Sequence, residues 1–315
     1  MREEAIVDVP TDEAAEVRSR LAERGIPALI DIHTHFMPEP VMRKVWAYFS
    51  AGGHLVGRRW PIAYRGSEED RLATIRSFGV RRFSSLCYPH KPRMAQWLND
   101  WSASFADQHP DCLRSATFFP EEGAATYVRE AITDGTQVFK VHVQVGGYDV
   151  HDPLLDEVWM ALEESGTPVI LHGGDGPMPG KHTGASPMRR LLERFPELTM
   201  VAAHLGMPDY GEFLDMASDF PRVHLDTTMA FTRFTEELMP FPRARLEDLY
   251  AQSDRVVFGT DFPNIPYSYL HALDSLLDLS MGVEWERAVL HDNAARLLGL
   301  EVPPAAVEGV SGTTG

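Results

Sequence analysis

Two histidines separated by one residue end the first strongly apolar run of the chain. Residues 28–38 read ALIDIHTHFMP, so His33 and His35 stand shortly before a proline that stops a strand. Side chains at positions i and i+2 of a strand point to the same face, so the two imidazoles project side by side. Imidazoles held in this way suit a divalent metal ion, whereas two histidines that only pack would need two separate hydrogen-bond partners.

Three more apolar runs end in a histidine or an aspartate. PVILH ends at His172, LTMVAAH ends at His204 and RVVFGTD ends at Asp261. Taken singly, each side chain has a structural explanation, and Asp261 could simply form an Asx-turn. Taken with the first two histidines, they are hard to explain by packing, because unpaired imidazoles are costly to bury. Three neutral imidazoles and a carboxylate bind a divalent ion such as Zn²⁺ well and leave one position open for water.

The elements that must position these residues alternate between short β-branched runs and helical segments. Strands that alternate with helices imply a parallel sheet, and about eight such units imply a closed (β/α)₈ TIM barrel, an α/β fold. An open doubly wound sheet is the alternative, but it usually has fewer units and a Gly-rich phosphate loop after its first strand. The predicted strands span residues 28–35, 80–88, 112–119, 137–144, 168–172, 198–204, 222–227 and 255–260. The predicted helices span residues 11–24, 68–78, 91–108, 124–134, 153–165, 187–195, 210–219, 244–252, 268–279 and 284–299.

We predict a single barrel domain with an addition at each end. Residues 28–300 form the barrel, and residues 1–27 form an N-terminal arm with a short helix. Residues 301–315 are rich in Pro, Gly, Ser and Thr and are expected to be a disordered tail.

Two connections at the expected barrel mouth are too long for simple turns. Residues 36–66 form a long aromatic loop after the first strand, and residues 173–187 follow the fifth strand. Loops of this length are usually functional or disordered. We therefore take Arg58 and Trp60 of the first loop, and His182 of the second, as candidate substrate contacts.

The strand over residues 137–144 places two polar side chains inside the barrel. In QVFKVHVQ, Lys140 and His142 share one face, while Phe139 and Val141 share the other. The apolar face should meet the surrounding helices, so Lys140 and His142 are expected to point inward as substrate contacts. Lys140 could equally be a buried lysine that is paired with an acid such as Asp31.

Bulk composition limits the partners of the protein. The formal net charge of −17 makes nucleic acid and anionic membranes poor partners, and a small-molecule substrate fits better. No apolar run approaches the ~20 residues of a membrane span, and the first residues show no secretory signal. Cys87 and Cys112 are expected to be reduced thiols, so we expect a cytoplasmic location. The sequence leaves a homodimer open.

The segments DIHTH, ILHGG, VAAHLGMP, FGTDFPN and HDNAARLLGL together resemble the amidohydrolase superfamily. The resemblance covers roughly residues 28 to 300 and is strongest to the amidohydrolase-related branch that includes aminocarboxymuconate semialdehyde decarboxylase. By that resemblance His204 is the catalytic histidine, and the metal ligands are His33, His35, His172 and Asp261.

The same resemblance bears on Lys140. In two-metal members of the superfamily a lysine on the fourth strand is carboxylated and bridges the ions, and decarboxylase relatives commonly lack this lysine. A carboxylated lysine is an anion that needs two cations beside it. Whether Lys140 is carboxylated therefore depends on whether the site holds one metal ion or two. We predict one Zn²⁺ ion and an unmodified Lys140.

Three functions remain open on this sequence. A metal-dependent hydrolase would cleave a small amide, lactone or ester, with Asp261 moving the proton of water and His204 stabilising the oxyanion. A non-oxidative decarboxylase would use the same metal site on a small carboxylic acid. A non-catalytic barrel is the third possibility, but it would be expected to lose one of the ligands. The presence of Lys140 favours the hydrolase.

Overall fold

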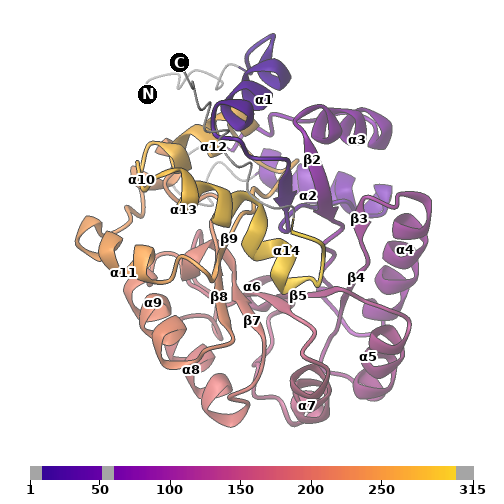
Figure 1. The fold of residues 1–315 in the computed structure, drawn as a ribbon. Coiled ribbons are helices and arrows are strands. Elements are labelled where there is room, and N and C mark those ends of the chain that lie inside the picture. The colour runs from indigo at the N-terminus through magenta and orange to yellow at the C-terminus, as the bar shows by residue number, and fades with distance from the viewer. Residues whose placement is uncertain (1–8, 52–59, 303–315) are drawn as a thin grey trace, which may run out of the picture.

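A ring of short parallel strands forms the centre of the computed structural model, which describes residues 9–51 and 60–302 (Figure 1). The strands pair in the orders β1-β2-β3 and β4 to β9, and every pairing is parallel. Their bounds are β1 Leu29–Asp31, β2 Val80–Ser84, β3 Cys112–Leu113, β4 Ser115–Thr117, β5 Val138–His142, β6 Val169–His172, β7 Met200–Ala202, β8 Val223–Asp226 and β9 Val256–Val257.

Two features turn these strands into a (β/α)₈ barrel. Only Arg114 separates β3 from β4, so the two occupy one strand position of the ring. Beyond β1 and β9 the backbone closes the ring, because the amide of Ile32 donates to Phe258 O at 3.1 Å and that of Asp261 donates to His33 O at 2.8 Å. The predicted barrel is therefore confirmed.

Helices surround the strands on the outside (Figure 1). Their apolar faces pack on the β-branched outer face of the sheet, as parallel sheets require. The bounds are α1 Glu13–Glu23, α2 Glu39–Ala51, α3 Glu68–Ser77, α4 Ala95–Gln108, α5 Ala124–Thr133, α6 Val143–Gly146, α7 Asp156–Ser165, α8 Ala185–Arg194, α9 Tyr210–Asp219, α10 Arg233–Glu236, α11 Leu246–Ala251, α12 Tyr269–Leu277, α13 Val283–Arg287 and α14 Asn293–Leu297. Single turns of 3₁₀ or π type are η1 Pro153–Leu155, η2 Ala203–Gly206, η3 Arg243–Arg245 and η4 Ala288–Asp292.

The sequence prediction is wrong for part of the long aromatic loop over residues 36–66. Residues 39–51 form α2, in which Glu39 and Pro40 occupy the first turn. Proline and acidic residues are favoured there, because the first amides of a helix have no partner within it and its N-terminus carries partial positive charge. The aromatic residues of this segment thus belong partly to a helix. Residues 52–59, including the candidate Arg58, lie outside the described part of the chain.

Several predicted elements are too long at the barrel mouth. The first predicted strand ends at Asp31 and not at residue 35, and the last one, which is β9, ends at Val257 and not at residue 260. The strand predicted over 137–144 ends at His142, where α6 begins. The alternation of apolar and polar side chains does not show at which residue the backbone stops pairing with the neighbouring strand. Beyond that residue the chain turns and directs a polar side chain toward the centre of the barrel. The helix predicted over 284–299 is divided by the π turn η4.

The N-terminal helix α1 lies against α12 on the outside of the barrel. Its residues Val17 and Leu21 are buried in the main hydrophobic core. Arg20 Nε donates to Asp274 at 2.9 Å, and Arg24 Nε donates to Glu286 at 2.8 Å. Apolar burial and ion pairs thus fix α1 to the barrel.

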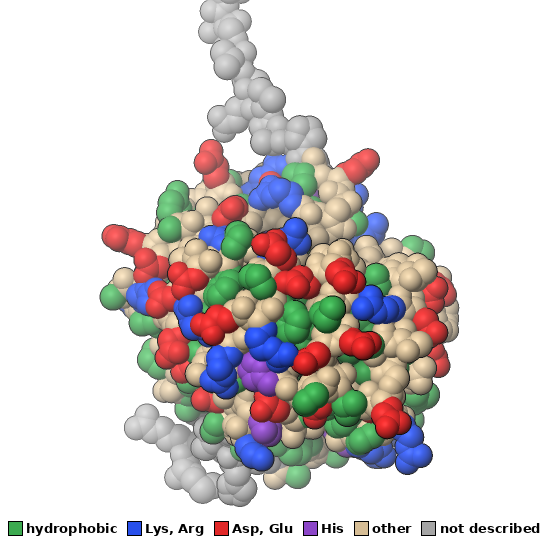
Figure 2. All heavy atoms as spheres, turned by 90° about the horizontal axis from the view of Figure 1, so that it is seen from below, with side chains coloured by type: hydrophobic (Ala, Val, Ile, Leu, Met, Phe, Trp, Pro, Cys, Tyr) green, Lys and Arg blue, Asp and Glu red, His purple; other side chains and the backbone are tan. Residues whose placement is uncertain are grey.

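Two of the expectations drawn from bulk composition can be checked in the described residues. Cys87 and Cys112 are buried free thiols, as expected. None of the described helices is both long and apolar enough to cross a membrane. On the face drawn in Figure 2, acidic and basic side chains are interspersed, and hydrophobic side chains form small scattered groups.

Candidate metal centre

His33 and His35 leave the end of β1 with their Nε2 atoms directed to the same point. His33 Nδ1 lies 2.8 Å from the Asp226 carboxylate, and His35 Nδ1 lies 2.8 Å from Leu86 O. Both partners are acceptors, so each Nδ1 carries the hydrogen and each Nε2 presents a lone pair. Burial and the neighbouring Lys140 ammonium lower the pKa of His33 to about 4, which keeps its imidazole neutral.

Asp261 faces both of these nitrogens from the loop after β9. Its Oδ1 lies 2.9 Å from His35 Nε2 and 3.3 Å from His33 Nε2. Its φ of 72° is in the left-handed region, a rare conformation for a residue other than glycine, and such residues concentrate at functional sites. Burial raises the pKa of Asp261, but attraction to positive charge at His33 and His35 outweighs burial and holds the pKa well below its ordinary value, so the carboxylate is anionic when a proton or a cation lies between these groups.

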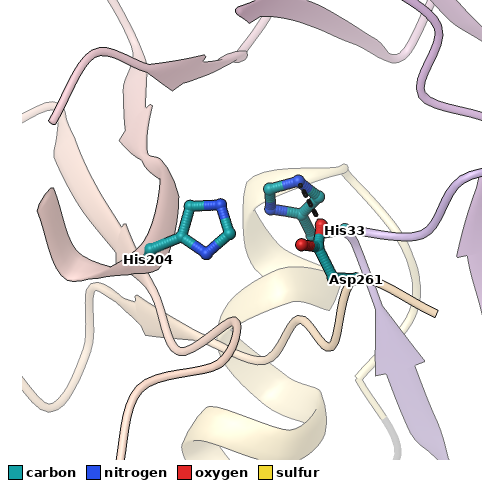
Figure 3. Close-up of side chains that lie close together, drawn as sticks. All are labelled: His33, His204 and Asp261. Atoms are coloured by element: carbon teal, nitrogen blue, oxygen red, sulfur yellow. Dashed lines mark ion pairs between the residues drawn. The ribbon is translucent and has the colours of Figure 1, made fainter. Parts of the chain in front are cut away.

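His204 completes the group from the turn η2, on the opposite side of the barrel mouth. Its backbone has a φ of 57°, and its Nδ1 donates to Thr228 O at 3.1 Å. One ligand atom each from His33, His204 and Asp261 lies within 4.8 Å of the others (Figure 3). Burial lowers the pKa of His204, so its Nε2 also presents a lone pair.

Asp226, the last residue of β8, orients two of the histidines at once. Its Oδ2 accepts from His33 Nδ1, and its Oδ1 accepts from the backbone amides of His204 at 3.0 Å and Thr228 at 2.9 Å. Asp226 is not among the site residues predicted from the sequence, although it shares a strand face with His224, where both could line the pocket or only form hydrogen bonds. A signal was present, because the predicted strand over residues 222–227 carries an aspartate near its end, as the run RVVFGTD does at Asp261.

Lys140 lies inside the barrel, as expected. It is fully buried, and its Nζ donates to His33 Nε2 at 2.9 Å. Burial lowers the pKa of this amine to about 8. The anticipated pairing with Asp31 does not occur, because Asp31 instead accepts from Thr260 at 2.6 Å and from Tyr269 at 3.0 Å.

His172 and His142 lie beside this group and stack on each other. Their ring centroids are 4.0 Å apart at 19°, and the His172 ring lies 4.5 Å from that of His204. His172 Nε2 donates to Gly176 O at 2.8 Å, so Nδ1 is its lone-pair nitrogen. His172 is therefore adjacent to the closest group without belonging to it. Burial first, and then the neighbouring imidazoles, lower the pKa of both histidines well below its ordinary value.

The other candidate substrate contacts lie farther from this point. Trp60 is buried, and its Nε1 donates to the backbone oxygen of Asn264 at 2.7 Å. It lines a small apolar cleft together with Met207, Met229 and others. His182 instead lies 3.5 Å from Asp149, through its Nδ1.

The arrangement of donor atoms fits a divalent cation. The Nε2 atom of His35 is a lone-pair atom, yet it faces the anionic Asp261 Oδ1 at 2.9 Å. His33 Nε2 lies 3.3 Å from the same oxygen and accepts from the Lys140 ammonium. Atoms of this kind repel one another unless a proton or a cation lies between them. Ligand bonds of about 2.0–2.1 Å in tetrahedral geometry separate the ligand atoms by roughly 3.3 Å, which is close to these distances.

Comparisons with known proteins show the family and the fold of the chain. A family model described as amidohydrolase matches residues 30–300. None of the curated proteins that were compared matches the chain. Among solved structures, an uncharacterised TIM-barrel protein from Bordetella bronchiseptica is 21% identical with a TM-score of 0.69, over 86% of this chain and 98% of that chain.

Two enzymes also share the fold. A 5-carboxyvanillate decarboxylase from Novosphingobium aromaticivorans, with bound manganese, is 15% identical with a TM-score of 0.58, over 88% of this chain and 99% of that chain. A probable 2-pyrone-4,6-dicarboxylic acid hydrolase from Acinetobacter baumannii is 14% identical with a TM-score of 0.56, over 86% of this chain and 99% of that chain. At these identities the likeness shows the fold alone, and the two enzymes differ in their reactions.

Proposed function

Because the chain belongs to the amidohydrolase family, we propose that it is a metal-dependent hydrolase of a small amide, lactone or ester. The observation that carries the proposal is the convergence of His33 Nε2, His35 Nε2 and Asp261 Oδ1. We propose that these groups and His172 hold one Zn²⁺ ion, because an imidazole-rich donor set with one carboxylate suits zinc. The chemistry available from such an ion is Lewis acidity, which polarises a carbonyl oxygen and eases the deprotonation of water.

Asp261 is the proton carrier in this proposal. Its Oδ1 is engaged by the histidines, and within the described residues no hydrogen bond to its Oδ2 is found. That oxygen accepts a proton from the attacking water and passes it to the leaving nitrogen or oxygen.

His204 acts from the opposite side of the mouth. Its Nδ1 hydrogen is committed to Thr228 O, so only Nε2 faces the centre. Nε2 is a lone-pair atom in the neutral ring, but the negative charge that develops as the carbonyl is attacked favours the protonated form. His204 then takes a proton from solvent on Nε2 and donates a hydrogen bond to that oxygen. Lys140 supplies a buried positive charge close to the same centre and is proposed to contact a substrate oxygen.

The proposal is tested with the full chain, depleted of metal and reloaded with Zn²⁺ or Mn²⁺. We expect one ion per chain by elemental analysis, and metal-dependent hydrolysis of a panel of esters, lactones and amides. In ¹⁸O-labelled water the product acid should carry one label. Asp261→Asn should lower the rate by at least about a hundredfold, the scale of a lost acid–base group. Full hydrolysis after metal depletion would contradict the proposal.

A decarboxylase is the second candidate, supported by the fold shared with the manganese-bound 5-carboxyvanillate decarboxylase. In that reaction the Lys140 ammonium, next to His33, would pair with a substrate carboxylate. The two reactions separate cleanly, because a decarboxylase releases CO₂ and leaves no ¹⁸O in its product.

We also propose a cytoplasmic location. The support is that both cysteines are free and buried, which is typical of proteins in a reducing compartment.

A further inference from the structure

A buried carboxylate on the N-terminal helix lies at the start of a helix of the barrel. Glu13 is the first residue of α1 and only 5% exposed. Its Oε1 accepts hydrogen bonds from the Tyr64 hydroxyl at 2.7 Å and from the backbone amide of Leu270 at 3.0 Å. The Tyr64 oxygen in turn accepts from the amide of Tyr269 at 2.5 Å.

These contacts satisfy the start of α12. Tyr269 and Leu270 are its first two residues, and amides in the first turn of a helix have no partner within the helix. Glu13 and Tyr64 therefore cap α12 from outside it. An anion is favourable at this position, because the N-terminus of a helix carries partial positive charge.

The hydrogen-bond network continues from α12 to the floor of the metal centre. The Tyr269 hydroxyl donates to Asp31 Oδ2 at 3.0 Å, and the Thr260 hydroxyl donates to the same oxygen at 2.6 Å. Thr260 Oγ1 accepts from the amide of Phe262 at 3.1 Å, and Asp31 Oδ1 accepts from the amide of His33 at 3.3 Å. Asp31 thus holds the backbone on both sides of Asp261 and at His33.

We infer that Glu13 is a positioning residue for the metal centre, acting through Tyr64, α12 and Asp31 on the segments that carry His33 and Asp261. The predicted effect on metal binding rests on the proposed metal site, whereas the hydrogen bonds from Glu13 to Asp31 do not depend on it. It gives α1 a role beyond covering the barrel. Ligand segments held in this way lose less conformational freedom when the ion binds, which favours binding.

Three variants of α1 separate this role from general docking of the helix. Glu13→Ala removes the acceptor, whereas Glu13→Gln keeps an amide oxygen that can accept the same two bonds. Arg20→Ala is the matched control, because it removes the 2.9 Å ion pair with Asp274 of α12 and leaves the network intact.

The first readout is hydrogen exchange in the metal-free full chain. We expect Glu13→Ala to speed exchange about three- to tenfold in peptides over residues 32–36 and 259–264, relative to a peptide that contains β6, since both hydrogen bonds to Glu13 are lost and part of that loss reaches these segments. Glu13→Gln and Arg20→Ala should stay within about twofold of the parent in this ratio. An equal effect of Glu13→Ala and Arg20→Ala, or no effect of Glu13→Ala, would overturn the inference.

The second readout is the affinity for Zn²⁺, titrated against a chromophoric chelator. Glu13→Ala should bind about three- to tenfold more weakly, and the other two variants should match the parent. Equal affinity in all variants would overturn the positioning role. A parent that binds no Zn²⁺ but shows the exchange effect would refute the proposed metal centre and leave the support network standing.

A second pair of variants serves if Glu13→Ala does not fold. Tyr269→Phe removes the hydrogen bond to Asp31 and keeps the ring. Its control is Tyr267→Phe, because the buried Tyr267 hydroxyl faces Thr232 and lies outside the network from Glu13 to Asp31. Only Tyr269→Phe should speed exchange over residues 32–36 and 259–264, and an equal response of both variants would overturn the inference.

Discussion

At the scale of single residues, the candidate metal centre depends on which nitrogen of each imidazole already donates a hydrogen bond within the protein. His33, His35 and His204 all donate through Nδ1, to Asp226, Leu86 O and Thr228 O. Each Nε2 is left as a lone-pair donor. Ligand histidines in metalloproteins are usually fixed by such partners, which set both the tautomer and the orientation of the ring.

Asp226→Asn should weaken metal binding about 10- to 100-fold, the usual loss for a partner behind a ligand histidine. An amide nitrogen can donate to His33 Nδ1, which would move the ring hydrogen to Nε2 and block the lone pair. The measurement is a Zn²⁺ titration. Asp292→Asn is the matched control, because Asp292 lies 2.7 Å from Nδ1 of the buried His291. Parent-like affinity in Asp226→Asn would refute this role.

His172 and His204 should separate into ligand and catalyst. We expect His172→Asn to lose the ion, and His204→Asn to keep most of it while turnover falls by on the order of 10²-fold. Elemental analysis checks both variants. Loss of metal from His204→Asn alone would instead make His204 the fourth ligand, in keeping with its position beside His33 and Asp261.

At the scale of elements, the strand ends are held together by close backbone packing. Gly259 follows β9, and a Cβ atom there would lie 2.3 Å from Thr228 Oγ1 and 2.7 Å from His33 Cβ. The ends of β1, β8 and β9 therefore approach one another more closely than any side chain at residue 259 allows. Close approach of this kind sets the distance between His33 and Asp261.

Gly259→Ala should displace His33 and cost about 1–3 kcal/mol in the free energy of unfolding, as is typical of overpacking. Zn²⁺ affinity should fall with it. Chemical denaturation and metal titration check the two effects. Gly211→Ala in α9 is the control, because its added Cβ would meet only the mobile end of Arg245, and alanine favours a helix. Equal effects of the two substitutions would contradict the packing argument.

At the scale of the whole molecule, a cluster of neutral imidazoles is buried in an acidic protein with a net charge of −17. Burial is the main cause that lowers the pKa values of the four histidines of this cluster from 6.5, and it does the same for His224 and His271 elsewhere in the fold: the cluster is His33, His142, His172 and His204. The unfolded chain therefore binds more protons than the folded barrel as the pH falls below 6.5. Protons and folding are linked through this difference.

The metal-free protein should consequently lose stability between pH 7.5 and pH 5.5, by roughly 1 kcal/mol for each buried imidazole that stays neutral. Neutral imidazole is favoured in the folded state, so the stability is present above about pH 6.5 and falls as the pH decreases. Urea denaturation at several pH values measures the effect. A midpoint that is constant or rises over this range would contradict it.

The sequence by itself determined the barrel and the five residues at its mouth. Apolar runs, the period of two along a strand and the alternation of strands with helices are local patterns, and they led to His33, His35, His172, His204 and Asp261. The same patterns did not predict α2, because its aromatic residues are typical of the long loop that was expected over residues 36–66. They also predicted strands that extend too far toward their C-terminal ends, since hydrophobicity does not show where the backbone stops pairing with the neighbouring strand.

Only the tertiary structure decided which groups pair at the centre. Asp226 lies 193 residues from His33, Lys140 lies 107 residues from it, and Leu270 lies 257 residues from Glu13. Such pairs depend on strand register, on helix docking and on side-chain rotamers, none of which is encoded in neighbouring residues. For that reason the pairing of Lys140 with His33 and the network from Glu13 to Asp31 became visible only in the folded barrel.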